Sequence, residues 1–256
     1  MRAALLPLLV AMVPTMASAA DPTVLHDLAP RGLIRAAINL GNPVLAHSEP
    51  GGPAGVSVDL ARRLGEALGV PVTFVTYPTA GAVTASAGAD LWDVCFLAID
   101  PKRAEGIAFT APYVAIRGSY LVPAGSPIRS VADVDRAGIR IAVGAGSAYD
   151  LFLSRTLAHA TPVRAPSSAE AVALFARDGL EVAAGVHQPL AAYAADHPGV
   201  RLLPGHFMEI PQAMGLPAGR PAGAAYLAAF LAKAKADGFI ARRLEADGQD
   251  PTLATP

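Results

Sequence analysis

Cysteine is almost absent from this sequence, since Cys95 is the single one among 256 residues. One cysteine excludes an internal disulfide framework and any zinc module that needs several thiolates. Because Cys95 stands in an apolar run, we interpret it as a small buried side chain. Excess charge is also missing, because 20 Lys and Arg face 21 Asp and Glu and leave a formal net charge of −1. We therefore expect no nucleic-acid partner, because no field of the whole protein would attract one.

Common catalytic motifs are missing as well. The sequence contains neither HExxH nor GxSxG, and its six histidines are scattered. We accordingly predict no catalytic residue, no metal ligands and no cofactor. Apolar side chains, by contrast, are plentiful: 53% of the residues are hydrophobic and 16% are charged. This composition excludes a disordered chain and allows a sizeable core.

The N-terminus has the pattern of a secretory signal. Arg2 supplies a positive charge, an apolar run follows at 3–16, and the small residues at 17–19 (ASA) form a cleavage site. We predict a signal peptide at 1–19, cut after Ala19, and a periplasmic mature protein; an uncleaved anchor is the alternative. No later run is long enough to predict a transmembrane helix.

Strand-like and helix-like segments alternate along the rest of the chain. Apolar patterns and turn signals predict strands at 33–39, 72–76, 93–98, 139–143, 181–184 and 200–203. Helical periodicity and start signals predict helices at 57–68, 79–87, 147–157, 167–176, 189–195 and 222–245, the last with a break at Asp237-Gly238. This order is typical of an α/β fold with parallel sheets covered on both faces. Ligands in such folds bind at the carboxyl ends of strands, so the candidate loops follow Asn39, Ala98 and Val143.

The first and third of these loops carry groups that bind polar or anionic ligands. The amides of Asn39 and Asn42 flank a glycine turn and could hydrogen-bond a ligand, although plain turn chemistry explains them equally well. Residues 144–149 (GAGSAY) follow a strand and open a helix, whose free N–H groups bind anions. Ser147 could cap this helix or donate to a ligand. The spacing is neither that of a Walker P-loop nor that of a dinucleotide fingerprint.

The second loop presents an arginine. Asp100 is a candidate N-cap and Pro101 suits the first helical position, which leaves Arg103 one turn in, close to the end of a strand. A guanidinium there can hold a carboxylate through two parallel hydrogen bonds. An arginine in this setting is also commonly a solvated surface residue.

Several passages together match the pattern of a known family. They are residues 55–61 (GVSVDLA), 92–94 (WDV), 100–105 (DPKRAE), 109–113 (FTAPY) and 138–147 (GIRIAVGAGS). In this order they resemble the extracytoplasmic solute-binding proteins of ABC importers, specifically the amino-acid-binding type. Each motif is short, but the ordered combination is specific and covers nearly the whole chain after the N-terminal segment.

The resemblance implies a two-lobed α/β fold of the periplasmic-binding-protein type. Each lobe would be a mostly parallel sheet flanked by helices, and two crossover strands would join the lobes. Lobe one would comprise 20–117 plus 212–256, and lobe two 118–211. The ligand would bind in the cleft between them, and closure would bury it.

The same resemblance implies a set of ligand contacts. Arg103 matches the family's carboxylate-binding arginine, and Ser147 with the N–H groups around Ala148 matches the contact from lobe two. Ala98 stands where the family often has a hydroxyl, and Asn42 stands where it often has an aromatic ring. The residues that could substitute for the missing ring are Phe96 and Tyr149.

The clearest departure concerns the ligand's ammonium group. Amino-acid binders of this family carry an Asp after the late strand, whereas residues 184–188 here read AGVHQ. A buried ammonium without a counter-charge is costly. Either the ligand lacks an α-ammonium, or neutral groups hold it. The groups available are His187, Asn39 and Gln212, although His187 could equally be a helix-start residue at the surface.

We therefore predict an exported, monomeric, non-catalytic protein that captures a small carboxylate-bearing solute. That solute would be an amino acid or a related organic acid, and an ABC permease would receive it. Two alternatives stay open. One is a periplasmic dehydratase of the same fold, of the cyclohexadienyl dehydratase type, for which Glu209 is the acid to check. The other is a binding protein that docks to a sensory receptor.

Overall fold

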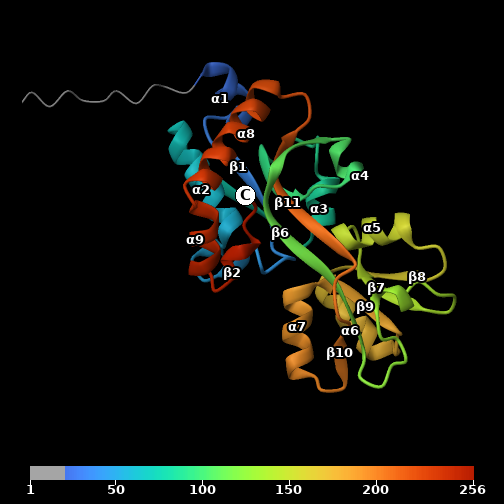
Figure 1. Cartoon of the computed structure of the whole chain (residues 1–256). Helices are drawn as coiled ribbons and strands as arrows, with labels where there is room; N and C mark the ends of the chain where they lie inside the picture. The colour runs from blue at the N-terminus through green and yellow to red at the C-terminus, as the bar shows by residue number, and fades with distance from the viewer. Residues whose placement is uncertain (1–20) are drawn as a thin grey trace, which may run out of the picture.

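A computed structural model describes residues 21–256 of the chain. The predicted signal peptide at 1–19 lies outside these residues. Within them, one large sheet runs through the molecule and helices lie along it (Figure 1). No helix of this part of the chain is both long and apolar enough to cross a bilayer.

The large sheet has nine strands. They are β1 (Ile34–Asn39), β4 (Val72–Tyr77), β5 (Val94–Ala98), β6 (Ile107–Pro123), β7 (Arg140–Gly144), β8 (Thr161–Ala165), β9 (Val182–Val186), β10 (Val200–Leu202) and β11 (Met208–Pro217). Their order is β4-β1-β5-β11-β6-β9-β7-β8, with β10 paired to β6. A separate hairpin joins β2 (His47–Glu49) to β3 (Gly52–Ala54).

Both ends of the sheet are parallel and its centre is antiparallel. β1 pairs in parallel with β4 and β5, and β7 pairs in parallel with β8 and β9. Between these groups, β6 and β11 run antiparallel to each other and to their outer neighbours β9 and β5. These two strands are the crossovers of a two-lobed α/β fold, as the family resemblance implied. The lobe limits at 117/118 and 211/212 stay a prediction, and β6 begins to pair with β9 at Gly118.

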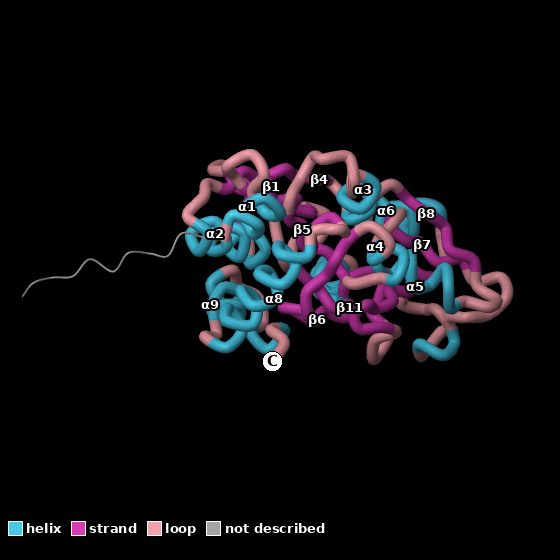
Figure 2. Tube along the Cα trace, turned by 90° about the horizontal axis from the view of Figure 1, so that it is seen from above, coloured by secondary structure: helices cyan, strands magenta, loops and turns pink. Residues whose placement is uncertain are grey.

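The helices gather around the two parallel groups. They are α1 (Pro22–Leu28), α2 (Val56–Leu68), α3 (Ala80–Ala85), α4 (Pro101–Ala104), α5 (Ala148–Thr156), α6 (Ser168–Asp178), α7 (His187–Asp196), α8 (Pro221–Ala236) and α9 (Phe239–Ala246). Helices α1, α2, α8 and α9 lie at the β1 end, and α5 and α6 lie at the β7–β8 end (Figure 2). The C-terminal helices therefore return to the first lobe.

Local chemistry explains where several elements begin and end. Helix α2 buries Leu60 and Leu64 on its inner face and stops at Gly69, whose φ of 67° only glycine adopts freely. The expected break in the C-terminal helix occurs at Gly238, with φ 72°. Strand β5 is buried along its whole length, as its apolar run predicted. Strand β8 was not predicted, because Pro162 interrupts its pattern; the edge of a sheet tolerates a proline.

Candidate ligand-binding cavity

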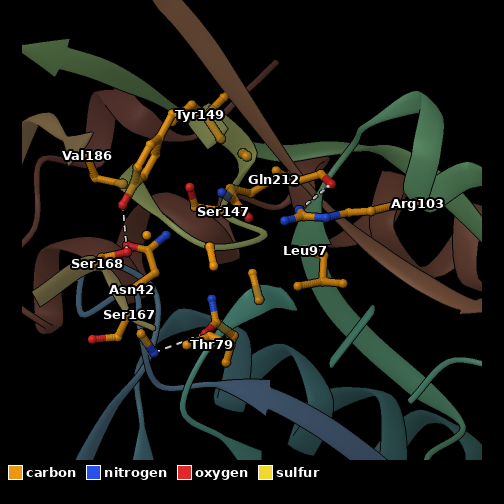
Figure 3. Close-up of a pocket in the computed structure, with 18 residues that line it drawn as sticks. Asn42, Thr79, Leu97, Arg103, Ser147, Tyr149, Ser167, Ser168, Val186 and Gln212 are labelled. Atoms are coloured by element: carbon orange, nitrogen blue, oxygen red, sulfur yellow. Dashed lines mark hydrogen bonds between the residues drawn. The ribbon is translucent and has the colours of Figure 1, made fainter. Parts of the chain in front are cut away.

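A small cavity of about 50 Å³ lies where the ends of β1, β5 and β7 meet, at the three loops named from the sequence (Figure 3). Eight of the ten predicted site residues line it. They are Asn39, Asn42, Ala98, Arg103, Ser147, Ala148, Tyr149 and Gln212. The carboxyl ends of parallel strands thus bring together residues that lie far apart in the sequence.

Arg103 is buried at the cavity, with 1% of its surface exposed. The Asp100 carboxylate caps α4 by accepting from the Lys102 N–H at 2.9 Å, which places Arg103 beside the end of β5. Its Nη1 donates to the Ala98 carbonyl at 3.0 Å and its Nη2 to the Gly146 carbonyl at 2.9 Å. Its Nε has no partner among the described residues. The surface alternative for this arginine is therefore wrong.

The charge of Arg103 has no carboxylate beside it. Burial lowers the pKa of its guanidinium to about 10, and the nearby Asp100 opposes that shift only in part. Asp100 instead pairs with Arg155 at 2.8 Å. No Asp or Glu is among the described residues that line the cavity. A buried cation that meets only carbonyl dipoles has unused capacity to bind an anion.

The glycine turn after β7 is held rigidly at the opposite wall. Gly146 has φ 68°, and its N–H donates to the Asp150 carboxylate at 2.9 Å. Ser147 caps α5 by accepting from the Asp150 N–H at 3.0 Å, and it lines the cavity. The N–H of Ala148 belongs to the first helical turn, where no partner exists within the helix.

The two lobes touch around this cavity. Nη2 of Arg103, from the first lobe, reaches the Gly146 carbonyl of the second lobe. Asp100 and Arg155 form an ion pair between the same two lobes. Gly81 of α3 lies so close to Gly146 that a Cβ on Gly146 would stand 2.9 Å from the Gly81 Cα. Backbone therefore packs directly on backbone across the cleft.

A polar cluster lies across the cavity from Arg103 in Figure 3. Tyr149 is 2% exposed, and its hydroxyl donates to Ser168 Oγ at 2.7 Å. Burial raises the pKa of Tyr149, so it stays a neutral donor. Asn42 lies beside this pair, and its side-chain Oδ1 is buried without a partner in the described part of the chain. Asn39 instead uses its Oδ1 to accept from the Gly41 N–H at 3.0 Å, which is the turn role.

Two predicted site residues lie elsewhere. Phe96 packs edge-on against Tyr113 in the core, with ring centroids 6.2 Å apart, and does not line the cavity. His187 is exposed at the start of α7, and its Nδ1 lies 3.0 Å from Ser119 Oγ. Neither can replace the aromatic platform or hold an ammonium in this cavity.

The sequence analysis missed three hydroxyl residues of the cavity, Thr79, Ser167 and Ser168. Thr79 and Ser167 are N-caps of α3 and α6, so both helices begin at the cavity. The signal was present, because both had been recognised as helix starts. The sequence did not indicate that these two helix starts lie at the cavity. The strands that precede them were not used for this purpose, because β8 was not predicted and the end of β4 was not considered as a ligand-binding loop.

The acid suggested for a dehydratase is not at this site. Glu209 is exposed on β11 and does not line the cavity, although its neighbour Ile210 does. Across residues 21–256 there is also no group of three or more His, Cys, Asp or Glu side chains that could hold a metal ion.

The two-lobed α/β architecture, with a cationic cavity at the strand ends between the lobes, is the fold of the periplasmic-binding-protein type. The chain belongs to the bacterial extracellular solute-binding proteins, family 3, whose model matches residues 34–246. No curated protein matches the sequence.

Solved structures share this fold at low sequence identity. A mutant of ArgBP from T. maritima is 19% identical with a TM-score of 0.73, over 87% of this chain and 98% of that one. The ancestral amino acid-binding protein AncCDT-1, a precursor of cyclohexadienyl dehydratase, is 23% identical with a TM-score of 0.72, over 87% and 98%. A putative binding component of an ABC transporter from Wolinella succinogenes, complexed with lysine, is 22% identical with a TM-score of 0.71, over 84% and 95%.

Proposed function

We propose that the protein captures a small carboxylate-bearing solute in the cavity at Arg103 and delivers it to an ABC permease. The observation that carries this proposal is the buried guanidinium of Arg103, which has no carboxylate beside it and an unpartnered Nε. Leaving a charged donor buried and incompletely paired is expensive. A ligand carboxylate would supply the missing charge and the missing acceptor together.

Groups from both lobes are in place to hold that carboxylate. Arg103 belongs to the first lobe, while the Ser147 hydroxyl and the Ala148 N–H belong to the second. An anion that accepts from all three joins the lobes, and this gives the closed form a higher ligand affinity than the open form. The first turn of α5 adds the favourable end of its helix dipole.

An ordinary α-amino acid fits the cavity less well than an acid without an ammonium group. No carboxylate is found among the described lining residues, so an ammonium would be buried against neutral groups alone. The same lack of an acidic side chain disfavours a dehydratase, which needs a proton donor at the site. Sustained turnover of prephenate by the purified protein would restore that alternative.

The site is tested by Arg103→Ala in a thermal-shift screen of keto acids, dicarboxylates, aromatic acids and amino acids. A ligand at 100 times its Kd adds about 2.7 kcal/mol to the free energy of unfolding, and Arg103→Ala should remove most of the resulting shift. The matched control is Lys102→Ala, which deletes an exposed cation from the same helix. If Arg103→Ala binds the selected acid as tightly as wild type, the site assignment is wrong.

Export of the protein and delivery of the ligand are two further parts of the proposal, and each needs its own test. We infer that the mature chain begins at Ala20, outside the cytoplasm, and that it acts as a monomer beside its permease. The family's extracellular character supports the location. N-terminal sequencing of protein recovered from the periplasmic fraction tests the cleavage site, and uptake of the selected acid in cells with and without the protein tests delivery.

A further inference from the structure

A second and larger cavity opens beside the first. Its volume is about 390 Å³, against about 50 Å³ for the cavity at Arg103. The two share Gly41, Asn42, Tyr149, Ser168 and Val186 as lining residues, so they are neighbours along one wall. We call the second one the apolar cavity.

The rest of the apolar cavity is lined almost wholly by carbon. Besides the shared residues it is formed by Pro43, Val172, Leu190, Tyr193 and a few small residues. No charged side chain is among its described lining residues. Leu190 belongs to the buried core of the second lobe, and Val172 and Tyr193 pack against that core. An occupant of this space would therefore contact the outer face of a hydrophobic core.

The position of the apolar cavity relative to Arg103 indicates how a ligand would be oriented. Arg103 lines the small cavity alone, whereas Tyr149 and Ser168 line both. Figure 3 places Arg103 on one side of the small cavity, and Tyr149, Ser168 and Val186 on the other. A molecule whose acid group is held by Arg103 would reach the apolar cavity by passing the Tyr149–Ser168 pair.

Both lobes contribute to this space. Pro43 comes from the loop after β1, in the first lobe, whereas Val172 and Tyr193 come from α6 and α7, in the second. An apolar group lying between them would be buried from both sides when the lobes close. The apolar cavity therefore contributes to affinity in the same closed form that the carboxylate favours.

We propose that the physiological ligand is a monocarboxylate that carries an apolar tail and no α-ammonium group, with its acid group at Arg103 and its tail in the apolar cavity. This inference rests on the proposed function and names the ligand class for the same site. Three features carry it together: the guanidinium with its unpartnered Nε, the absence of an acidic side chain among the described lining residues, and about 390 Å³ of largely carbon-lined space next to a polar cavity that fits little beyond a headgroup.

The test is a homologous series. Straight-chain monocarboxylates from acetate to octanoate, and the 2-amino acids of equal length, are titrated into the purified protein by calorimetry. We expect the Kd of the unsubstituted acids to fall by about fourfold for each methylene until the apolar cavity is full. The 2-amino acid of each length should bind at least about tenfold more weakly, because its ammonium has no counter-charge.

A variant that shrinks the apolar cavity separates the tail from the headgroup. Ala173 lines this cavity on an exposed turn of α6, so Ala173→Leu adds bulk there without entering the core. We expect an unchanged Kd for short acids and a loss of about tenfold for the longest ones. Ala229→Leu, at an exposed position of α8 that lines neither cavity, is the matched control and should change neither.

The outcomes distinguish this inference from the function beneath it. If binding needs Arg103 but short acids or 2-amino acids bind as tightly as long-tailed acids, the tail assignment is overturned and the carboxylate function stands. If Ala173→Leu affects all chain lengths equally, the tail does not occupy this cavity and the assignment is likewise overturned. If no acid of either series binds, or if binding ignores Arg103→Ala, both proposals fail.

Discussion

Two buried arginines in the first lobe, Arg35 and Arg103, are used in opposite ways. Arg35 on β1 is 8% exposed and Arg103 on α4 is 1% exposed. Arg35 grips both oxygens of Asp93, through Nε at 2.9 Å and Nη2 at 2.8 Å, and its Nη2 also reaches Asp90 at 2.7 Å. The partners of Arg103 are carbonyl oxygens alone, and its Nε is unpaired within residues 21–256.

The pKa values of the two guanidinium groups move in opposite directions for this reason. The hydrogen bonds that Arg35 donates to Asp93 raise the pKa of Arg35, whereas burial lowers the pKa of Arg103 to about 10. The fold neutralises the first charge with carboxylates in direct contact, whereas the second hydrogen-bonds only to carbonyl oxygens. Burial by itself therefore does not separate a structural arginine such as Arg35 from Arg103, which we propose to bind the ligand; the presence of an internal carboxylate partner does.

The largest expected effect is on stability, at Arg35. Arg35→Met leaves the fully buried Asp93 with the backbone N–H of residue 35 at 3.0 Å and Arg220 at 3.5 Å as its partners, and should lower the free energy of unfolding by about 3–5 kcal/mol. Arg103→Met should leave the ligand-free protein unchanged or stabilise it by about 1 kcal/mol, because it removes an uncompensated charge. Urea denaturation followed by circular dichroism, without ligand, measures both.

The control for this pair is Arg31→Met. Arg31 also contacts Asp90, at 2.6 Å, but its side chain is 57% exposed, so its loss should cost less than about 1 kcal/mol. A cost at Arg103 as large as that at Arg35 would contradict the comparison and make Arg103 part of the structural framework.

The fold was predictable where a local pattern determines an element. The apolar stripe of α2 with its terminal Gly69, the buried run of β5 and the break at Gly238 all follow from residues close in sequence. Strand β8 and the β2–β3 hairpin were missed because their residues are partly polar and contain prolines. Pairing with a neighbouring strand, which a single sequence does not display, makes them strands.

The sequence predicted which loops form the site. It predicted less well which groups each side chain of the site pairs with. Strand ends converge by geometry, which is why Asn42, Arg103 and Ser147 come together. The charge partners of Arg103 do not follow from the sequence. Asp100 is only three residues away, yet it caps α4 and pairs with Arg155 of the other lobe. The pairing of Asp100 with Arg155 depends on how the two lobes contact each other. Because of this pairing, Arg103 has no carboxylate in direct contact.

A third arginine, Arg155, forms an ion pair with Asp100, and we expect its removal to have a smaller effect than that of Arg35. The Asp100 and Arg155 side chains are 4% and 45% exposed, and the ion pair joins the lobes without touching the cavity. Arg155→Ala should weaken ligand binding by about threefold to fivefold, because it removes a contact between the two lobes. It should lower the free energy of unfolding by less than Arg35→Met does, because Arg155 is 45% exposed. Calorimetric Kd values at low and high salt measure the loss, which salt should mask.

The control for that ion pair is Arg177→Ala. Arg177 pairs with its neighbour Asp178 within α6, so its removal should not alter ligand affinity. Equal losses in the two variants would show that net charge, rather than contact between the lobes, determines affinity.

The smallest effect at neutral pH concerns the titration of Arg103. Only the protonated guanidinium attracts a carboxylate, and its pKa in the ligand-free protein is about 10. Affinity should therefore be constant from about pH 7 to 9 and fall as the pH rises through about 10, approaching a tenfold loss per further pH unit. Arg35 contributes no such loss, because its pKa is raised. Calorimetry from pH 7 to about 10.5 measures this pH dependence, which Lys102→Ala should not alter; a midpoint near neutrality would mean that Arg103 does not carry the charge that binds the ligand.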